Sequence, residues 1–272
     1  MNKNYKIKDI PKIGFGTYKL KTAVEIDYSL TEALKNGYKM IDTAQLYKNE
    51  HLISNFLYNI LPTLELNMTR EDIWITSKVP YFTMLEGDEV KIRKGIEQSI
   101  NLFGGYIDLY LIHASNPNDV LTWRLLREFQ IAGKIKYVGI SNYNLERLDN
   151  FIDRIGSEEA KHIYMNQIEF NPFLNRADLV KRCQNLDIRI TAYGSLYKEN
   201  EYIKSLSNKY NISSKQILLA WALDNDITVI PMSRKKEHII ENIESIKIKL
   251  EKDEINILNG FNENYTRFLK HL

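Results

Sequence analysis

Four titratable residues in this sequence, Asp42, Tyr47, Lys78 and His113, have the side chains needed to move a proton at a carbonyl group. A tyrosine hydroxyl has a reference pKa of about 10, and a neighbouring ammonium such as that of Lys78 would lower this pKa by stabilising the phenolate. Asp42 could balance the charge of the lysine. His113 could donate a hydrogen bond that orients a carbonyl oxygen. Together the four residues predict a proton-transfer site with Tyr47 as the proton donor.

Each of these residues also has an ordinary structural explanation when it is considered alone. Asp42 could cap a strand end, and Tyr47 could be a half-buried aromatic residue. Lys78 could extend its stem over the surface, and His113 could be a hydrogen-bonded core residue. The catalytic interpretation therefore depends on a fold that brings distant parts of the chain together.

The elements that would position these residues alternate between short β-type runs and amphipathic segments. The β-type runs are residues 13–16, 39–41, 73–77, 107–112, 137–140, 163–168, 188–193 and 228–230. Apolar residues recur at helical spacing in residues 23–36, 90–103, 120–132 and 213–223. Gly37 and Gly133 mark expected helix ends, whereas Asn118 and Ser213 are candidate N-caps.

A closed barrel fits this pattern better than an open doubly wound sheet. Eight units in 272 residues leave about 34 residues for each, close to the roughly 30 that a strand–helix–strand unit needs. An open dinucleotide-binding sheet would carry a Gly-x-Gly-x-x-Gly loop, and Gly14-Phe15-Gly16 lacks the third glycine. We predict an α/β protein with a (β/α)8 TIM barrel, one domain over residues 1–272, with all carboxyl strand ends on one rim.

The composition excludes several classes of function. With 37 basic and 35 acidic residues the net charge is +2, so no strong field favours nucleic acid or a membrane surface. The sequence lacks the run of about 20 apolar residues that would cross a bilayer and the apolar stretch of a secretory signal. Cys183 is the single cysteine, and there is no Cys/His cluster at ligand spacing, so we expect neither a disulfide nor a metal. We expect a cytoplasmic protein.

From about residue 11 to residue 242 the motifs resemble, in order, those of the aldo-keto reductase family. Residues 41–47 are similar to the aspartate–tyrosine signature of the family, residues 76–78 to its lysine strand and residues 108–113 to its histidine strand. Further matching motifs are residues 14–18, 133–135, 138–142, 166–172, 192–196 and 230–233. The resemblance implies a (β/α)8 barrel with a short N-terminal hairpin and a short C-terminal helix and tail. It also implies that the barrel binds NADP(H) and moves a hydride between the nicotinamide and a carbonyl carbon.

The resemblance assigns a role to each matching position. Tyr47 would be the acid in reduction and the base in oxidation, with Asp42, Lys78 and His113 in the roles given above. Ser141, Asn142 and Gln167 would hold the nicotinamide carboxamide, and Tyr193 would stack on the ring. The other cofactor-binding residues implied are Gly16, Thr17, Tyr18, Asp42, Gly194, Ser195, Leu196, Pro231, Met232, Ser233, Arg234, His238, Glu241 and Asn242.

The chain departs from the family where the 2′-phosphate of NADP(H) is usually held. Met232 and His238 stand at positions where the family commonly has lysine and arginine. Residues 234–236 are basic and lie at the predicted start of the last barrel helix, which suits a phosphate, although such a run is also typical of a solvated helix face. We expect NADP(H) to be preferred, with Arg234, Lys235 or His238 compensating, and leave NAD(H) open as a second cofactor.

The substrate side of the predicted site also differs from many relatives. Ala114 and Tyr81 fall where tryptophan is frequent, and Asn171 replaces a frequent histidine. Smaller side chains would widen or reshape the pocket. The candidate pocket residues are Tyr18, Tyr47, Tyr81, Phe82, His113 and Ala114. Because few residues follow Asn242, we expect an open pocket that takes small aldehydes, dicarbonyls or short sugars.

The leading hypothesis is a monomeric NADP(H)-dependent reductase of small carbonyl compounds, with no nucleic-acid or membrane partner. An alternative is a cofactor-binding regulatory subunit that resembles channel-associated members of the family and has little turnover. The four intact proton-transfer residues argue against this alternative without excluding it.

Overall fold

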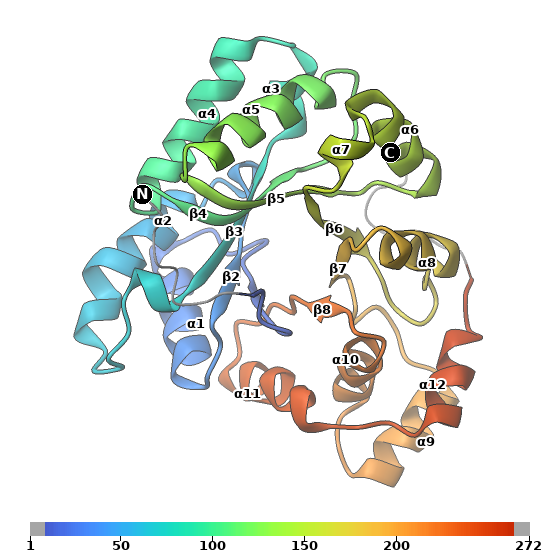
Figure 1. Ribbon diagram of the computed structural model, residues 1–272. Helices are drawn as coiled ribbons and strands as arrows, with labels where there is room; N and C mark the ends of the chain where they lie inside the picture. Colours follow the sequence, from blue (N-terminus) through green and yellow to red (C-terminus); the bar gives the residue numbers. More distant parts are fainter. Residues whose placement is uncertain (1–8, 264–272) are drawn as a thin grey trace.

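Eight parallel strands form the centre of the protein, and helices surround them on the outside (Figure 1). The computed structural model describes residues 9–263. The strands are β1 (Phe15–Gly16), β2 (Met40–Asp42), β3 (Trp74–Val79), β4 (Ile107–Ile112), β5 (Ile135–Ser141), β6 (Ile163–Glu169), β7 (Arg189–Tyr193) and β8 (Thr228–Val229). Each strand pairs in parallel with the next along the chain. The eight predicted runs and their order are confirmed, with small shifts at their ends.

The first and last strands meet and close the sheet into a barrel. The backbone N–H of Gly14 donates to the carbonyl of Val229 at 2.8 Å, and that of Gly16 donates to Pro231 at 3.1 Å. A parallel bridge joins Ile13 to Val229. A Cβ at Gly16 would lie only 2.7 Å from the carbonyl oxygen of Ile230, so the seam requires glycine at this position. The predicted (β/α)8 barrel is therefore confirmed, whereas its extent as a single domain stays a prediction.

The helices follow the strands in alternation. They are α1 (Ala23–Lys35), α2 (Glu50–Asn55), α3 (Tyr81–Leu85), α4 (Glu89–Leu102), α5 (Asp119–Ile131), α6 (Leu145–Ile155), α7 (Ser157–Ala160), α8 (Ala177–Asn185), α9 (Glu201–Tyr210), α10 (Ser214–Asp224), α11 (Lys236–Glu244) and α12 (Lys252–Asn259). Short helical turns are η1 (Gln45–Tyr47), η2 (Phe56–Ile60), η3 (Leu61–Thr63), η4 (Arg70–Asp72) and η5 (Ser245–Lys247). Residues 1–8 and 264–272 lie outside the described residues, so the predicted N-terminal hairpin and C-terminal tail stay predictions.

Local signals explain where several helices begin and end. Ser213 caps α10 by accepting a hydrogen bond from the backbone of Gln216, as its position predicts. Gly37 and Gly133 have positive φ angles of 96° and 71° just after α1 and α5. Asn118 holds the N-cap position of α5, but its side chain makes no capping bond there and donates instead to the carbonyl of Met84 at 3.0 Å.

Two apolar layers hold the barrel together. Inside it, Leu109 and Leu111 of β4 pack in a small cluster with residues of β2, β3 and β6. Between the barrel and the helices, Tyr110 and Ile112 of the same strand join the main core. Successive residues of a strand thus serve opposite faces of the sheet.

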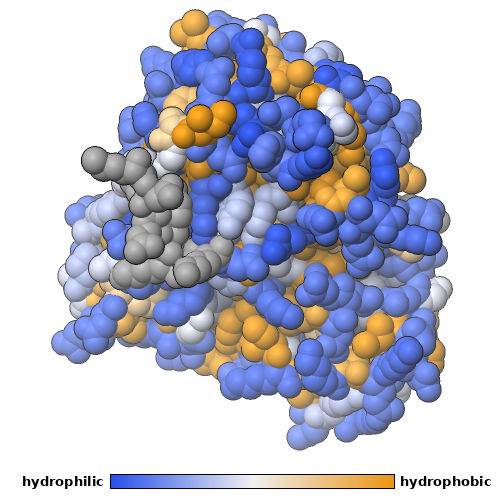
Figure 2. Space-filling view, viewed as in Figure 1, coloured by the Kyte–Doolittle hydropathy of each residue, from blue (hydrophilic) through white to orange (hydrophobic). Residues whose placement is uncertain are grey.

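On the face of the molecule seen in Figure 2, small apolar patches are separated by polar residues. Within residues 9–263, every helix is too short or too polar to span a membrane.

A buried ion pair fixes the amino-terminal side of β3 and β4. Arg70 of η4 lies 3.0 Å from Asp108 of β4, and the two side chains are 6% and 4% exposed. The guanidinium also donates to the carbonyls of Ile73, Phe103 and Tyr106. The carboxylate of Asp108 also accepts a hydrogen bond from the backbone N–H of Ile75 at 2.9 Å. The pair therefore holds the entrance of β3 against β4.

Replacing Arg70 by methionine should lower the free energy of unfolding by about 3–5 kcal/mol, because the carboxylate of Asp108 would stay buried without its cation. Urea denaturation measures this change. Arg124→Met is the control, since the Arg124 side chain is 58% exposed and its ion pairs should contribute about 1 kcal/mol or less. Equal losses in the two variants would contradict a special role for the buried pair.

Candidate active site

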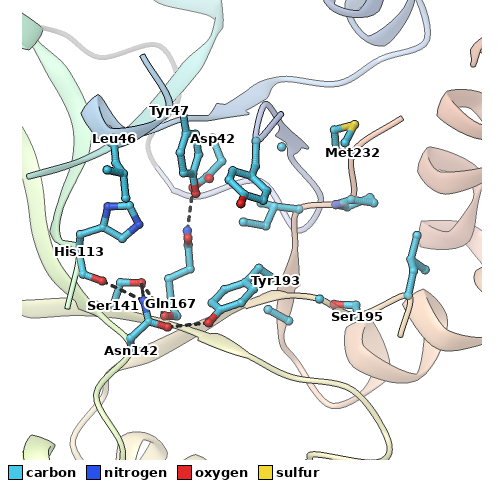
Figure 3. A pocket seen from close by; sticks show the side chains of 17 residues that line it. Asp42, Leu46, Tyr47, His113, Ser141, Asn142, Gln167, Tyr193, Ser195 and Met232 are labelled. Atoms are coloured by element: carbon cyan, nitrogen blue, oxygen red, sulfur yellow. Dashed lines mark hydrogen bonds between the residues drawn. The ribbon is translucent and has the colours of Figure 1, made fainter. Parts of the chain in front are cut away.

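A cavity of about 370 Å³ opens at the carboxyl ends of the strands. Figure 3 shows His113 and Leu46 on one side of its wall and Ser195 and Met232 on the other, with Gln167 and Tyr193 between them. The lining residues are Gly16, Tyr18, Asp42, Leu46, Tyr47, His113, Ser141, Asn142, Gln167, Ala192, Tyr193, Gly194, Ser195, Leu196, Ile230, Pro231 and Met232. Strands far apart in the sequence therefore contribute to one site, as the barrel prediction requires.

A buried ion pair lies at the floor of this site. Lys78 of β3 donates to the carboxylate of Asp42 at 2.7 Å and to the carbonyl of Thr43 at 2.8 Å. Both charged side chains are almost fully buried, at 1% and 3% exposed. The second carboxylate oxygen of Asp42 accepts from the amide of Gln167 at 2.7 Å, and thereby connects β2 to β6 across the barrel. Burial lowers the pKa of Lys78, and the negative charge of Asp42 acts in the opposite direction.

Tyr47 lies above this pair on the short turn η1, and its ring lines the cavity. The ammonium of Lys78 is 5.1 Å from the centre of the ring. The pKa of Tyr47 is raised well above its usual value, first by burial and then by the charge of Asp42. The expected net lowering of this pKa is therefore wrong for this arrangement, because burial and the charge of Asp42 outweigh the stabilisation of the phenolate by the ammonium of Lys78. At neutral pH the phenol is protonated, as a proton donor must be.

His113 follows β4 directly, and its ring stands edge-on to that of Tyr47, with the ring centres 5.9 Å apart. Burial, followed by the charge of Lys78, lowers the pKa of His113 to about 3. A neutral imidazole has one N–H donor and one acceptor nitrogen. Among the described residues Nδ1 has no hydrogen-bond partner. His113 can therefore donate a hydrogen bond into the cavity without carrying charge.

Asn142 connects the His113 side of the cavity to Tyr193 opposite. It takes the left-handed conformation, with φ of 65°, which asparagine tolerates better than most residues. Its amide nitrogen donates to the carbonyl of His113 at 2.8 Å, and its amide oxygen accepts from the hydroxyl of Tyr193 at 2.7 Å. Ser141 beside it donates to the carbonyl of Gln167 at 2.8 Å. The ring of Tyr193 is thus held in place at the cavity wall (Figure 3).

Of the other predicted cofactor residues, some line the cavity and some do not. Gly16, Tyr18, Gly194, Ser195, Leu196, Pro231 and Met232 are on its wall. The hydroxyl of Ser195 is buried and has no partner among the described residues, so it can bind a ligand. Thr17 lies behind the wall and donates to the carbonyl of Asp42 at 2.9 Å. Ser233, Arg234, His238, Glu241 and Asn242 lie beyond Met232, in the turn before α11 and on that helix.

Arg234 is engaged with another part of the protein. Its Nε lies 2.6 Å from a carboxylate oxygen of Glu25 on α1, and it also donates to the carbonyl of Lys19. Lys236 pairs with Glu32 of the same helix at 3.0 Å. A phosphate could engage Arg234 only in place of Glu25 or beside it. Binding of the 2′-phosphate by this region stays a prediction.

Three of the predicted pocket residues lie outside the cavity wall of the described structure. Tyr81 and Phe82 begin α3, and Phe82 is 66% exposed. Ala114 is buried just after His113. Conversely, sequence reasoning missed Leu46, Ala192 and Ile230, which do line the cavity. Each directly precedes a predicted site residue, Tyr47, Tyr193 or Pro231, and this adjacency is the sequence signal that could have identified it.

The similarity of this chain to known proteins extends over most of its length. Residues 12–198 and 194–263 match the model of the Aldo/keto reductase family. The chain is 31% identical to glyoxal reductase of Bacillus subtilis (94% of this chain, 90% of the relative) and 33% identical to methylglyoxal reductase DkgB of Escherichia coli O157:H7 (90% of each). An aldo-keto reductase of Bombyx mori, solved in complex with NADP, superposes with a TM-score of 0.83 at 27% identity, over 94% of this chain and 91% of that one.

The partly buried, neutral imidazole of His113 should make the protein less stable in mild acid. The unfolded chain takes up a proton at His113 below about pH 6.5, whereas the folded protein does so only near pH 3, so stability falls as the pH drops through this range. The His113→Asn variant lacks this pH-dependent contribution of His113, so its free energy of unfolding should fall less than that of the parent between pH 6.5 and about pH 4. Denaturant titrations at several pH values measure it, with exposed His162→Asn as control. Identical pH dependence of parent and His113→Asn would contradict the buried neutral state.

Proposed function

This chain belongs to the aldo/keto reductase family, and we propose that it reduces the carbonyl group of small aldehydes and ketones with NADPH, and oxidises alcohols in reverse. The observation that carries the proposal is the buried pair of Asp42 and Lys78 directly beneath Tyr47 at a cavity that His113 also lines. Family membership makes the protein an oxidoreductase that uses a nicotinamide cofactor. Its monomeric state and cytoplasmic location stay predictions.

The residues on the cavity wall fit a nicotinamide cofactor. Ser195 offers a buried hydroxyl without a partner, and Tyr193 offers an aromatic ring fixed by Asn142. Ser141, Asn142 and Gln167 supply the amides and hydroxyl that would hold the carboxamide. When bound, the reduced nicotinamide supplies the hydride. The NADP complex of the Bombyx mori relative supports NADP(H) as the cofactor.

The polar residues then divide the proton-transfer chemistry among them. The neutral ring of His113 donates a hydrogen bond that positions the carbonyl oxygen of the substrate. Tyr47 gives its proton to that oxygen as the carbonyl is reduced. The ammonium of Lys78, 5.1 Å from the ring, stabilises the negative charge left on Tyr47. Asp42 keeps Lys78 charged and in place.

Small carbonyl compounds are the proposed substrates. The two relatives named above are a glyoxal reductase and a methylglyoxal reductase, both of which act on short dicarbonyls by name. Tyr18 and Leu46, 47% and 41% exposed, place apolar surface at the cavity. The alternative of a regulatory subunit without turnover draws no support from these relatives, which are named as reductases.

Tyr47→Phe removes only the hydroxyl and should lower kcat for methylglyoxal by about 100-fold or more, because the reaction loses its proton donor. NADPH oxidation followed by absorbance measures the rate, and quenching of tryptophan fluorescence checks that NADPH still binds. A Tyr47→Phe enzyme that keeps most of its rate would reject the assignment of Tyr47.

NADPH should give a higher kcat/KM than NADH. The double variant Arg234→Ala, Lys235→Ala should lose about 10-fold or more of this parameter with NADPH and little with NADH, because only NADPH carries the 2′-phosphate. Lys247→Ala, beyond the far end of α11, is the control for a lost surface charge. Equal or better efficiency of the parent with NADH would reject the preference.

A further inference from the structure

The turn that carries Tyr47 is anchored on the outer face of the barrel by a cluster of polar side chains that are buried, except for the half-buried Gln45. We propose that two of them, Gln45 and Glu50, are positioning residues that hold the hydroxyl of Tyr47 where proton transfer occurs. The anchoring cluster consists of Gln45, Glu50, Ser77, Ser99 and Tyr110, none of which lines the cavity. The inference rests on the proposed function and adds residues to it.

Glu50 anchors the end of the turn where α2 begins. One carboxylate oxygen accepts from the hydroxyl of Ser77 at 2.5 Å, and the other accepts from the hydroxyl of Ser99 at 2.8 Å. Glu50 is only 8% exposed, although it is a glutamate at the first position of a helix. A buried carboxylate without hydrogen bonds would be costly, so the two serines account for its position.

Gln45 anchors the other end of the turn. Its amide nitrogen lies 2.8 Å from the hydroxyl of Ser99 and 2.9 Å from that of Tyr110, and it also contacts the carbonyl of Gly95. An amide nitrogen has two hydrogens, so it can serve two of these three acceptors at a time. Ser99 of α4 is shared with Glu50, and this sharing makes the two ends of the turn part of one hydrogen-bonded unit.

The cluster connects Tyr47 to the strands that carry the other catalytic residues. Ser77 is the neighbour of Lys78 in β3, and Tyr110 belongs to β4, which His113 follows. Because successive residues of a strand point to opposite faces, Lys78 reaches Asp42 at the cavity floor while Ser77 reaches Glu50 on the outside. The positions of phenol, ammonium and imidazole are thus fixed relative to one another through β3 and β4.

A third side chain fastens the inner side of the same turn. Asn49 accepts from the hydroxyl of Thr43 at 2.8 Å and donates to the carbonyls of Thr17 and Leu20, each at 3.0 Å. These bonds hold the turn against the loops that leave β1 and β2. On the outer side the turn is held by Gln45 and Glu50, and the exposed ammonium of Lys21 adds one bond to the carbonyl of Tyr47 at 3.2 Å. The negative charge of Glu50 also acts on Lys78, where it opposes the lowering of the pKa by burial.

Proton transfer is sensitive to small displacements of the donor, and a shift of about 1 Å can cost about 100-fold in rate. Glu50→Gln keeps the shape of the side chain, and Gln45→Met keeps its length. Each should lower kcat for methylglyoxal about 10-fold or more and leave the Kd for NADPH within about 2-fold of the parent. The kinetics are measured at saturating cofactor, and Kd by fluorescence quenching.

A double variant separates positioning from general destabilisation. If Glu50 acts through Tyr47, adding Glu50→Gln to Tyr47→Phe should cause no further loss of kcat, because the hydroxyl to be positioned is already gone. Asp108→Asn is the matched control, because this carboxylate is also buried, at 3% exposed against 8% for Glu50, and lies on β4 at the other rim of the barrel. The Asp108→Asn variant should unfold more easily while keeping the parent kcat.

Several results would overturn the proposal. These are a parent-like kcat in both single variants, a further loss in the double variant, or an Asp108→Asn kcat that falls as far as that of Glu50→Gln. If Glu50→Gln does not fold, Ser99→Ala replaces it, since it removes the shared hydroxyl and carries the same expectations. Absence of turnover in the parent would instead refute the proposed function, and turnover retained by Tyr47→Phe would refute the role of Tyr47.

Discussion

A charged lysine can remain in a protein interior only where its charge is balanced and its hydrogens are bonded, and the architecture of this site follows from that constraint. Lys78 meets it through Asp42 and the carbonyl of Thr43. Asp42 in turn uses its second oxygen to accept from Gln167, so the pair is linked to the far side of the barrel. With the ammonium fixed, the neighbouring phenol and imidazole have a fixed electrostatic environment.

That environment favours neutral groups on the cavity wall. Burial and the charges below keep His113 uncharged and Tyr47 protonated. A neutral imidazole can donate to an oxygen without repelling Lys78, and a protonated phenol is ready to give its proton. In the proposed reaction Lys78 therefore stabilises the charge that develops on Tyr47, and it does not ionise Tyr47 beforehand.

The barrel supports this chemistry with both faces of its strands. On the inner face Lys78 contributes to the cavity floor, and on the outer face the adjacent Ser77 holds the carboxylate of Glu50. The polar cluster beneath α4 occupies space that apolar residues could fill, at a cost in stability unless each group is paired. Its location behind the Tyr47 turn gives these buried polar residues a use in the site.

The sequence by itself determined the order of elements, because the period of apolar residues and the glycines at helix ends depend on near neighbours. It also predicted that Asp42, Tyr47, Lys78 and His113 lie together, since residues at strand ends share one rim once the sheet is parallel and closed. Only the tertiary structure decided how these charges act on one another. The direction of the pKa shift of Tyr47, the pairing of Arg234 with Glu25 and the cluster around Glu50 depend on distances of a few ångströms between segments remote in the chain, and no local pattern records such distances.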